Sequence, residues 1–420
     1  MEPALVLVLS VVFWGSVFLI GHNYVVYPAV LAFLGRGKSL PRERFETDEE
    51  FPEVAVLMAV YNEEAVLRRT LETMLASDYP AGKLKIFVGS DGSTDRSHEI
   101  VESFQANHPE LSLSVFHGRN GKIRIVNQLA IAARVSFGEP ESAAFVLCDA
   151  NVAWTPGMLR NLVRHFDRDD VSLVGSNVVD ASRRHEGIAE EEEAYVEREN
   201  RVKYYEGLLW GNTMGAFGAC YAMRASLFRP VPENFVVDDF FLTMKCIEAG
   251  QKAIVDPEAV CHEAVSTDIR EEFRRKKRIA AGNYQNMHYF RKLYRPWSGG
   301  WANWFAFWSH KGLRWLGPML LLAAMASCLA LSFLSPIYLV PLATFAISFA
   351  AAGLDWILAK CRPGLHVKSL RYVRYFYSMN AALLLGFFSY ARGVRGSVWE
   401  PTRRVQSDAV LAERQRVVES

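Results

Sequence analysis

The chain has 420 residues, half of them hydrophobic, and its 47 basic and 46 acidic side chains leave a formal net charge of +1 at pH 7. This balance argues against nucleic acid as a partner, because there is no excess of Lys and Arg to neutralise phosphates. The six cysteines include no CxxC pair, so neither a zinc site nor a disulfide framework is indicated.

A long apolar stretch comes first in the chain. Residues 3–35 contain no Asp, Glu, Lys or Arg, which exceeds the roughly 20 residues that a spanning helix needs. A cleaved signal peptide is the competing interpretation, but no basic region precedes the stretch and it is longer than a usual signal core. Four basic residues follow between positions 36 and 44, so the positive-inside rule places the next segment in the cytoplasm. We predict a transmembrane segment over 1–35 and a linker over 36–52.

Short apolar strands alternate with helices from residue 53 onward. Strands are expected over 54–60, 84–89 and 113–117, and a helix over 65–77 whose start Asn62 and its neighbours can cap. Such alternation is typical of an α/β domain with a mainly parallel sheet covered on both faces. The loops at the carboxyl ends of the strands then converge on one rim, where ligands bind.

A fourth strand ends in Asp149-Ala150-Asn151. Two oxygen donors at this spacing can hold a hard divalent cation, which takes its remaining ligands from water and a substrate's phosphates. Taken alone, the pair is better interpreted as a solvated turn. Its position on the predicted rim makes it a candidate metal site.

Four motifs in order resemble those of family 2 glycosyltransferases with the GT-A fold. They are AVYNEE at 59–64, DGSTD at 91–95, Gly-Lys at 121–122 and DAN at 149–151. The resemblance covers residues 54 to 285 and implies a mixed, mainly parallel α/β sheet flanked by helices, with terminal transmembrane helices and an interfacial helix added. It also implies an inverting, metal-dependent transfer of sugar from a UDP-sugar donor. We predict that the cytoplasmic catalytic domain covers residues 53–290.

The resemblance assigns substrate-binding residues on the rim. It implies that the uridine is bound by Ala59, Tyr61, Glu63 and Asp91, and that Lys122 lies near the diphosphate. An aromatic ring can stack on a base, a carboxylate can accept from base or ribose donors, and Lys supplies a positive charge. Considered singly, these residues are better explained as core, turn and surface positions, but jointly and in this order they are not.

A divalent ion, Mg²⁺ or Mn²⁺, is implied by the same resemblance. Its ligands would be Asp149 and Asn151. Many relatives carry Asp-x-Asp, whereas here the second position is an amide, which coordinates the ion but offsets less of its charge. Metal affinity and metal identity therefore stay open.

The acceptor side is predicted from two further segments. A Gly-rich segment at 215–224 resembles those that line the acceptor site, which makes Gly218 a candidate, with a tight packing loop as the alternative. The pair Asp238-Asp239 lies at the start of a helix that should end at Gly250. Carboxylates at a helix start are stabilised by the helix dipole. The resemblance implies that Asp239 is the general base and that Asp238 contributes to substrate binding, with a simple N-cap pair as the alternative.

Two charged helices flank the Asp pair. The acidic one, with six Glu over 190–199, is expected to present a mostly solvated face. The basic one carries Arg275 and Arg278, which share a face and could approach a leaving diphosphate. They occupy the position of the family's Gln-x-x-Arg-Trp motif, but Arg275 replaces the Gln. Ile279 replaces the Trp that stacks on the acceptor sugar in polymerising members. A basic stripe facing anionic lipid is the alternative.

The remainder of the chain is predicted to lie at or in the membrane. Four Trp between 297 and 308 would share one face of an interfacial helix over 291–312. A C-terminal transmembrane region is predicted over 313–392, with two spans in the charge-free stretch that follows the helix. Whether 375–391 forms a third span or a re-entrant segment is left open. A tail over 393–420 completes the chain.

These features predict a multi-pass enzyme of the cell (inner) membrane. The first hypothesis is transfer of a hexose or N-acetylhexosamine from a UDP-sugar to a growing exopolysaccharide, next to membrane lipids and other polysaccharide-synthesis subunits. The alternative is addition of one sugar to a glycolipid or polyprenyl-linked acceptor. A third hypothesis is an inactive membrane subunit of a synthase, against which the intact Asp91, Asp149 and Asp239 argue.

Overall fold

The computed structural model describes residues 3–41, 45–138, 141–181, 188–264, 268–361 and 367–394. The chain divides into two compact units. One combines Met1–Phe33 with Asp268–Gly393, and the other contains Leu34–Thr267. The predicted tail from residue 395 onward lies outside the described residues, as do two of the basic residues after the first apolar stretch, Arg42 and Arg44.

An eight-stranded sheet organises the unit that contains Leu34–Thr267, with the order β3-β2-β1-β4-β7-β6-β8-β5. The first four strands in this order run parallel, β7 runs antiparallel to both of its neighbours, and β8 is parallel to β6. The predicted mixed, mainly parallel sheet is therefore confirmed. The strands are β1 (Val54–Val60), β2 (Leu84–Asp91), β3 (Leu111–Phe116), β4 (Ala144–Cys148), β5 (Val152–Trp154), β6 (Val171–Asp180), β7 (Cys220–Arg224) and β8 (Lys252–Glu263).

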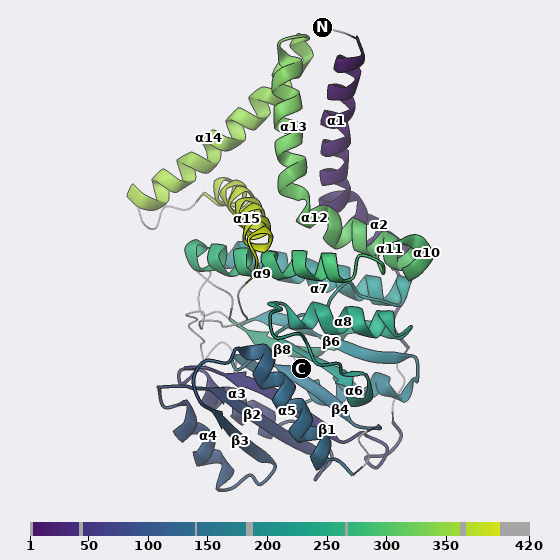
Figure 1. Cartoon of the computed structure of the whole chain (residues 1–420), viewed down its shortest axis with the longest axis vertical. Coiled ribbons are helices and arrows are strands. Elements are labelled where there is room, and N and C mark those ends of the chain that lie inside the picture. Colours follow the sequence, from purple (N-terminus) through teal and green to yellow (C-terminus); the bar gives the residue numbers. More distant parts are fainter. Residues whose placement is uncertain are drawn as a thin grey trace. The chain divides into compact units, whose positions relative to one another are not determined.

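Helices flank this sheet, as Figure 1 shows for α3, α4, α5 and α8. The predicted capping of α3 by the Asn62 segment is wrong, because no side chain caps this helix. The Asn62 side chain instead accepts from the Thr94 N–H (2.8 Å), so two rim loops bind each other. The helices are α3 (Leu67–Leu75), α4 (Ser97–Gln105), α5 (Lys122–Ser136), α6 (Met158–Val163), α7 (Ala189–Trp210) and α8 (Asp238–Glu248), with short 3-10 turns η2 (Arg164–Asp167) and η3 (Ala225–Leu227).

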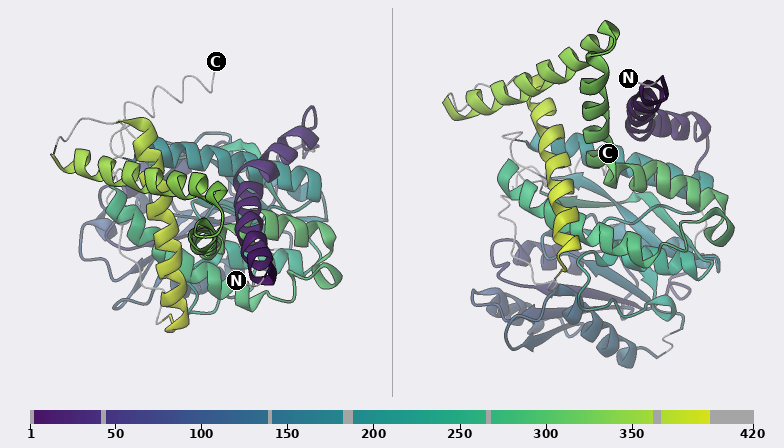
Figure 2. Two further views of the ribbon diagram at one scale, coloured as in Figure 1. Left: turned by 90° about the horizontal axis from the view of Figure 1, so that it is seen from above. Right: turned by 45° about the horizontal axis from the view of Figure 1, so that its top comes forward.

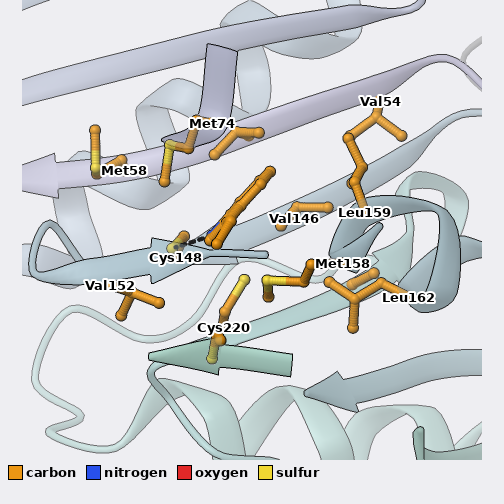
Figure 3. Close-up of a cluster of buried hydrophobic side chains, with 14 of the residues drawn as sticks. Val54, Met58, Met74, Val146, Cys148, Val152, Met158, Leu159, Leu162 and Cys220 are labelled. Carbon is orange, nitrogen blue, oxygen red and sulfur yellow. Dashed lines mark hydrogen bonds between the residues drawn. The ribbon is translucent and has the colours of Figure 1, made fainter. Parts of the chain in front are cut away.

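The core of this unit lies between β1, β4 and α6. All seven residues of β1 are buried, and Met58, Val146, Cys148 and Met158 lie close together in Figure 3. Burial of each large apolar side chain contributes about 1.5–3 kcal/mol. Because β4 ends at the buried Cys148 and the next N–H donates to the Ala219 carbonyl (2.9 Å), the Asp149 side chain starts at the rim of the sheet.

The acidic helix departs from its prediction. In α7, Glu191, Glu192, Glu199 and Glu206 are buried, so a mostly solvated face is the wrong description. The helix packs on β6 and β8, which covers one side of it. Buried carboxylates require polar partners, and Glu206 accepts from the Met214 N–H (3.0 Å).

The other unit is helical. Helix α1 packs against α13 (Figure 1), and α15, yellow in Figure 2, packs along α9. The absence of a side chain at Gly386 permits this approach, because an added Cβ would overlap Ala280. The elements are α1 (Pro3–Gly21), the π-helix η1 (His22–Val26), α2 (Tyr27–Leu34), α9 (Ile269–Tyr289), α10 (Pro296–Gly299), α11 (Trp301–Phe307), the π-helix η4 (Trp308–Gly312), α12 (Leu313–Trp315), α13 (Gly317–Ser332), the 3-10 turn η5 (Pro336–Tyr338), α14 (Leu339–Cys361) and α15 (Lys368–Ala391). Helix α9, predicted within the catalytic domain, thus groups with the apolar helices.

Two helices of the described chain are long and apolar enough to cross a membrane, Pro3–Leu34 and Pro336–Cys361. A third span exists if Trp301–Trp315 and Gly317–Ser332, bent by 65°, count as one. These helices indicate membrane association. Helix α15, which contains the undecided segment 375–391, is not among them.

The predicted continuous Trp-bearing helix is interrupted. It breaks at Gly300, whose φ of +81° lies in the left-handed region that favours glycine. Trp297 and Trp301 lie on either side of the break, and both are exposed. The sequence pattern of tryptophans every three or four residues therefore spans three elements, α10, α11 and the π-helix η4.

Candidate active site

Three segments distant in sequence meet at the ammonium group of Lys122. Lys122 is the first residue of α5, and its Nζ donates to Asp149 Oδ1 (2.8 Å) beyond the end of β4. The same Nζ lies 3.5 Å from Asp238 Oδ2, at the start of α8. The side chain of Lys122 as a whole is 26% exposed. The rim predicted from the strand ends thus contains a Lys between two carboxylates.

The charge of Lys122 is strongly favoured. Burial alone would lower the pKa of Lys122, but the carboxylates of Asp149, Asp238 and Asp239 outweigh burial and raise it above its usual range. The ammonium is therefore charged throughout the physiological pH range. A fixed positive charge at the start of a helix is suited to a phosphate group.

Asp239 lies next to this cluster, with its side chain against Gly218. Burial and the neighbouring Asp238 raise the pKa of Asp239 to about 6, while Lys203, Lys122 and a hydrogen bond from the Phe240 N–H act in the opposite direction. A carboxylate with a pKa near 6 is largely ionised at neutral pH and can still accept a proton effectively. The geometry is compatible with the predicted role of Asp239 as general base.

The position of Gly218 leads to a prediction. A Cβ added there would lie 2.9 Å from Asp239 Oδ2, closer than van der Waals contact allows. We expect Gly218→Ala to displace the Asp239 carboxylate and to lower kcat by about tenfold, since small displacements of a catalytic group are costly. The Tm should change little, because the Asp239 side chain can move away from the added methyl group. Steady-state kinetics and thermal unfolding measure the two effects. Gly157→Ala is the control, since the nearest atom there is 3.8 Å away; equal activity in both variants would contradict the prediction.

Asp91 is fully buried and holds the loop that leads into α5. Its carboxylate accepts from the N–H groups of Asn120 and Gly121 and pairs with Arg119 (3.3 Å). The guanidinium of Arg119 lies 3.3 Å from the centre of the Tyr61 ring. Asp91 therefore positions the segment that carries Lys122, and its direct contact with a nucleotide base, like that of Tyr61, stays a prediction. Sequence reasoning missed Arg119, although it lies three residues before Lys122.

The loop after β1 is held in place by the loop after β2. The Glu63 N–H donates to Ser97 Oγ (3.0 Å), and the Glu64 N–H donates to Asp95 Oδ2 (2.9 Å). Ala59 is the residue before the last in β1 and is buried. The predicted uridine residues of β1 and its loop thus lie on one ordered segment, and their contacts with a nucleotide stay predictions.

The predicted metal ligands lie on either side of Ala150. The side-chain N–H of Asn151 donates to Glu263 Oε1 (3.3 Å), and Asp149 accepts from Lys122. Among the residues that the structure describes, no group of three or more His, Cys, Asp or Glu side chains could hold a metal. The donor set of one carboxylate and one amide oxygen fits a hard divalent ion that takes further oxygens from a diphosphate.

Two predicted residues lie in the other unit. Arg275 and Arg278 are on α9, where Arg275 pairs with Glu272 one turn earlier (3.4 Å). Their role at the diphosphate stays a prediction.

Sequence reasoning also missed two buried polar residues. Tyr221 on β7 is buried, and desolvation together with Asp238, Asp239 and Asp149 raises the pKa of its hydroxyl. Lys203 on α7 is buried as well. No local sequence pattern identifies Tyr221 as a site residue, because the strand that contains it has the composition of an ordinary core strand. Lys203 could have been noticed as a cation within an acidic helix.

The sheet and the helices that flank it define the class of architecture, the GT-A fold. The mannosyltransferase PcManGT from Pyrobaculum calidifontis, solved in complex with GDP-Man and Mn²⁺, superposes with a TM-score of 0.64 at 22% sequence identity. The superposition covers 92% of this chain and 98% of that one. At this identity the likeness shows the fold alone.

Sequence comparison gives the family. The chain matches the family described as glycosyltransferase like family 2 over residues 52–282, more than half of its length, and it belongs to that family. A beta-monoglucosyldiacylglycerol synthase of Synechocystis is 25% identical over 245 residues, 56% of this chain and 48% of that protein. A probable glycosyltransferase of Bacillus subtilis, YdaM, is 29% identical over 143 residues, 33% of this chain and 32% of that protein. The chain thus spans about a third to about a half of the length of these relatives.

Proposed function

We propose that this protein is a membrane-associated, metal-dependent, inverting glycosyltransferase that moves a hexose or N-acetylhexosamine from a UDP-sugar to a lipid acceptor. Glycosyltransferase activity follows from the family. The observation that carries the proposal is the position of Lys122 between Asp149 and Asp238, with Asp239 adjoining. This arrangement combines a cation for a diphosphate with a carboxylate that can accept a proton.

The lipid acceptor is supported by two observations. Relatives with a named product are beta-monoglucosyldiacylglycerol synthases, and the chain has two or three helices apolar enough to cross a membrane. Both support the single-sugar, glycolipid alternative better than transfer to a growing exopolysaccharide. The replacement of the family's Trp by Ile279 points in the same direction.

The chemistry assigned to the chain's own residues is a single displacement. Asp239 accepts the proton of the acceptor hydroxyl as that oxygen attacks the anomeric carbon, and the diphosphate leaves toward Lys122. One displacement inverts the configuration at that carbon. A divalent ion held by Asp149 and Asn151 would act as a Lewis acid that offsets the charge of the leaving group. The neighbour solved with Mn²⁺ is compatible with such an ion.

The test uses the purified full-length protein and radiolabelled donors. UDP-glucose, UDP-galactose, UDP-N-acetylglucosamine and GDP-mannose are each incubated with diacylglycerol or polyprenyl phosphate in mixed micelles, with Mn²⁺, with Mg²⁺ or with EDTA. We expect one UDP-sugar to label a chloroform-soluble product, with loss of labelling in EDTA. A labelled polymer that stays at the origin of the chromatogram would favour the exopolysaccharide hypothesis. Failure to consume any donor, under conditions that preserve the fold, would favour an inactive subunit.

A further inference from the structure

We propose that Lys203 is a positioning residue for Asp239, and that it acts from α7 through the loop that forms the wall beside this carboxylate. The inference rests on the proposed function, in which Asp239 is the general base. Neither the family motifs nor the spacing of the site residues points to α7. The argument comes from a line of contacts from Lys203 to Asp239.

The first contact lies between Lys203 and an aromatic ring. Lys203 is 3% exposed, and its Nζ lies 3.4 Å from the centre of the Phe217 ring. Burial of an ammonium is unfavourable unless its charge is compensated, and the face of an aromatic ring attracts a cation. A lysine kept in the buried face of a helix therefore has a specific partner in the loop before β7.

The second contact lies between that loop and the base. Phe217 precedes Gly218, and a Cβ on Gly218 would lie 2.9 Å from Asp239 Oδ2. The same loop is tied to α8, because Thr243 Oγ1 accepts from the Ala216 N–H (3.1 Å) and donates to the Asp239 carbonyl (2.7 Å). The loop is thus attached to α8 through Thr243 and to α7 through Lys203. Movement of Phe217 would move the wall beside Asp239.

The charge of Lys203 also acts on the base. The charged groups that influence Asp239 are Asp238 in its own helix, Lys122 from α5 and Lys203 from α7, and the hydroxyl of Tyr221 faces the same carboxylates from β7. Burial and Asp238 favour the protonated form of Asp239, and the two lysines favour the ionised form. Lys122 is bonded to Asp149. Lys203, on α7, is the second cation whose charge favours the ionised form of Asp239.

The experiment measures kcat/KM against pH for the full-length protein with its identified donor. Lys203→Met keeps the length and apolar stem of the side chain but removes the charge. In the wild type, we expect the midpoint of the acidic limb of the profile near pH 6. In Lys203→Met it should move to a higher pH by about one unit, the lower end of the pKa shift that a nearby opposite charge causes. At pH 6 this lowers kcat/KM by roughly fivefold, with near-normal activity at pH 8. Lys203→Arg, which keeps the charge, should restore the limb.

A matched control is available on the same helix. Arg201 is exposed and pairs with Glu197 (2.7 Å), so Arg201→Met removes a charge of the same sign two residues away. Its profile should overlay that of the wild type. A purely structural role for Lys203 would lower activity equally at all pH values and leave the limb in place, which would overturn the proposal.

Folding failure does not remove the test. If Lys203→Met does not fold, Phe217→Leu takes its place, because it removes the ring that holds the ammonium, and an unmoved limb in that variant overturns the proposal. The two levels of inference are also separable. Loss of activity in Asp239→Asn with an unmoved limb in Lys203→Met refutes this inference alone, whereas full activity in Asp239→Asn refutes the base assignment and this inference with it.

Discussion

Replacement of Asp239 by asparagine should lower kcat/KM for sugar transfer by roughly 10²–10⁴-fold, the usual contribution of a general base. The amide is nearly isosteric with the carboxylate but cannot accept the proton of the acceptor hydroxyl. For the same reason the wild-type kcat/KM should fall as the pH drops below about 6, where Asp239 becomes protonated. The measurement is the initial rate of labelled product formation between pH 5 and pH 8.

Stability should change little in this variant or should increase. Because the pKa of Asp239 is raised from 3.8 to about 6 in the folded protein, the folded state binds the proton more tightly than the unfolded state. This contribution to stability is present in full below about pH 4 and is lost as the pH rises through about 6. Asparagine cannot ionise, so the stability of the variant should not show the decrease that the ionisation of Asp239 causes in the wild type as the pH rises. Tm values of both proteins at pH 5 and pH 8 measure this difference. Asp167→Asn, at an exposed aspartate, is the control; an Asp239→Asn rate equal to the control's would refute the assignment.

Lys122→Met should damage both stability and catalysis. It leaves Asp149, Asp238 and Asp239 without the ammonium that lies among them. Breaking a buried ion pair costs about 3–5 kcal/mol, and we expect about 2–3 kcal/mol here because a quarter of the side chain is exposed and water screens its charge. Loss of a charge-assisted contact to the donor's diphosphate should lower kcat/KM by about 10–100-fold.

The pH dependence distinguishes this effect from a general loss of packing. The raised pKa of Lys122 keeps its stabilising charge in place at all pH values below its usual 10.5, so the wild type has no loss from Lys122 between pH 5 and pH 8. In the variant, the deficit in unfolding free energy should shrink toward pH 5, because Asp239 becomes protonated and the repulsion among the carboxylates falls. Denaturant titrations followed by tryptophan fluorescence measure it.

The control for this variant is Lys85→Met. Lys85 is 28% exposed, close to the 26% of Lys122, but it pairs with a single carboxylate, Glu53, at 3.4 Å. We expect a loss of about 1 kcal/mol or less for that pair. Similar losses in the two variants would show that the cluster around Lys122 has no special electrostatic role.

The elements of the sheet were predictable because their signals are local. Apolar runs predicted β1 and β4 to within a residue or two, and the turn chemistry after each strand placed Asp91 and Asp149 at strand ends. The helix that begins at Asp238 and ends before Gly250 was equally readable. Since parallel strands end at the same edge, the sequence alone indicated that these residues share a rim.

The partners within the rim were not predictable in the same way. The contact of Asp91 with a nucleotide stays a prediction, and no local pattern indicated that its carboxylate also accepts from the backbone N–H groups of Asn120 and Gly121. The predicted solvated acidic helix is buried on one side, and its Lys203 lies against Phe217. Both arrangements depend on which loops and helices approach one another over long sequence separations, a property that a local pattern does not contain.

By itself, the sequence therefore determined the type of fold, the family and the strand ends that carry Asp91 and Asp149, because strand periodicity and motif order are properties of neighbouring positions. Only the tertiary structure decided that Lys122 bridges Asp149 and Asp238, and that Gly218 lies against Asp239. The physical reason is that β7 inserts antiparallel between β4 and β6, and the preceding loop then meets α8. Hydrogen bonds, burial and charge interactions across such a junction depend on distances that folding creates.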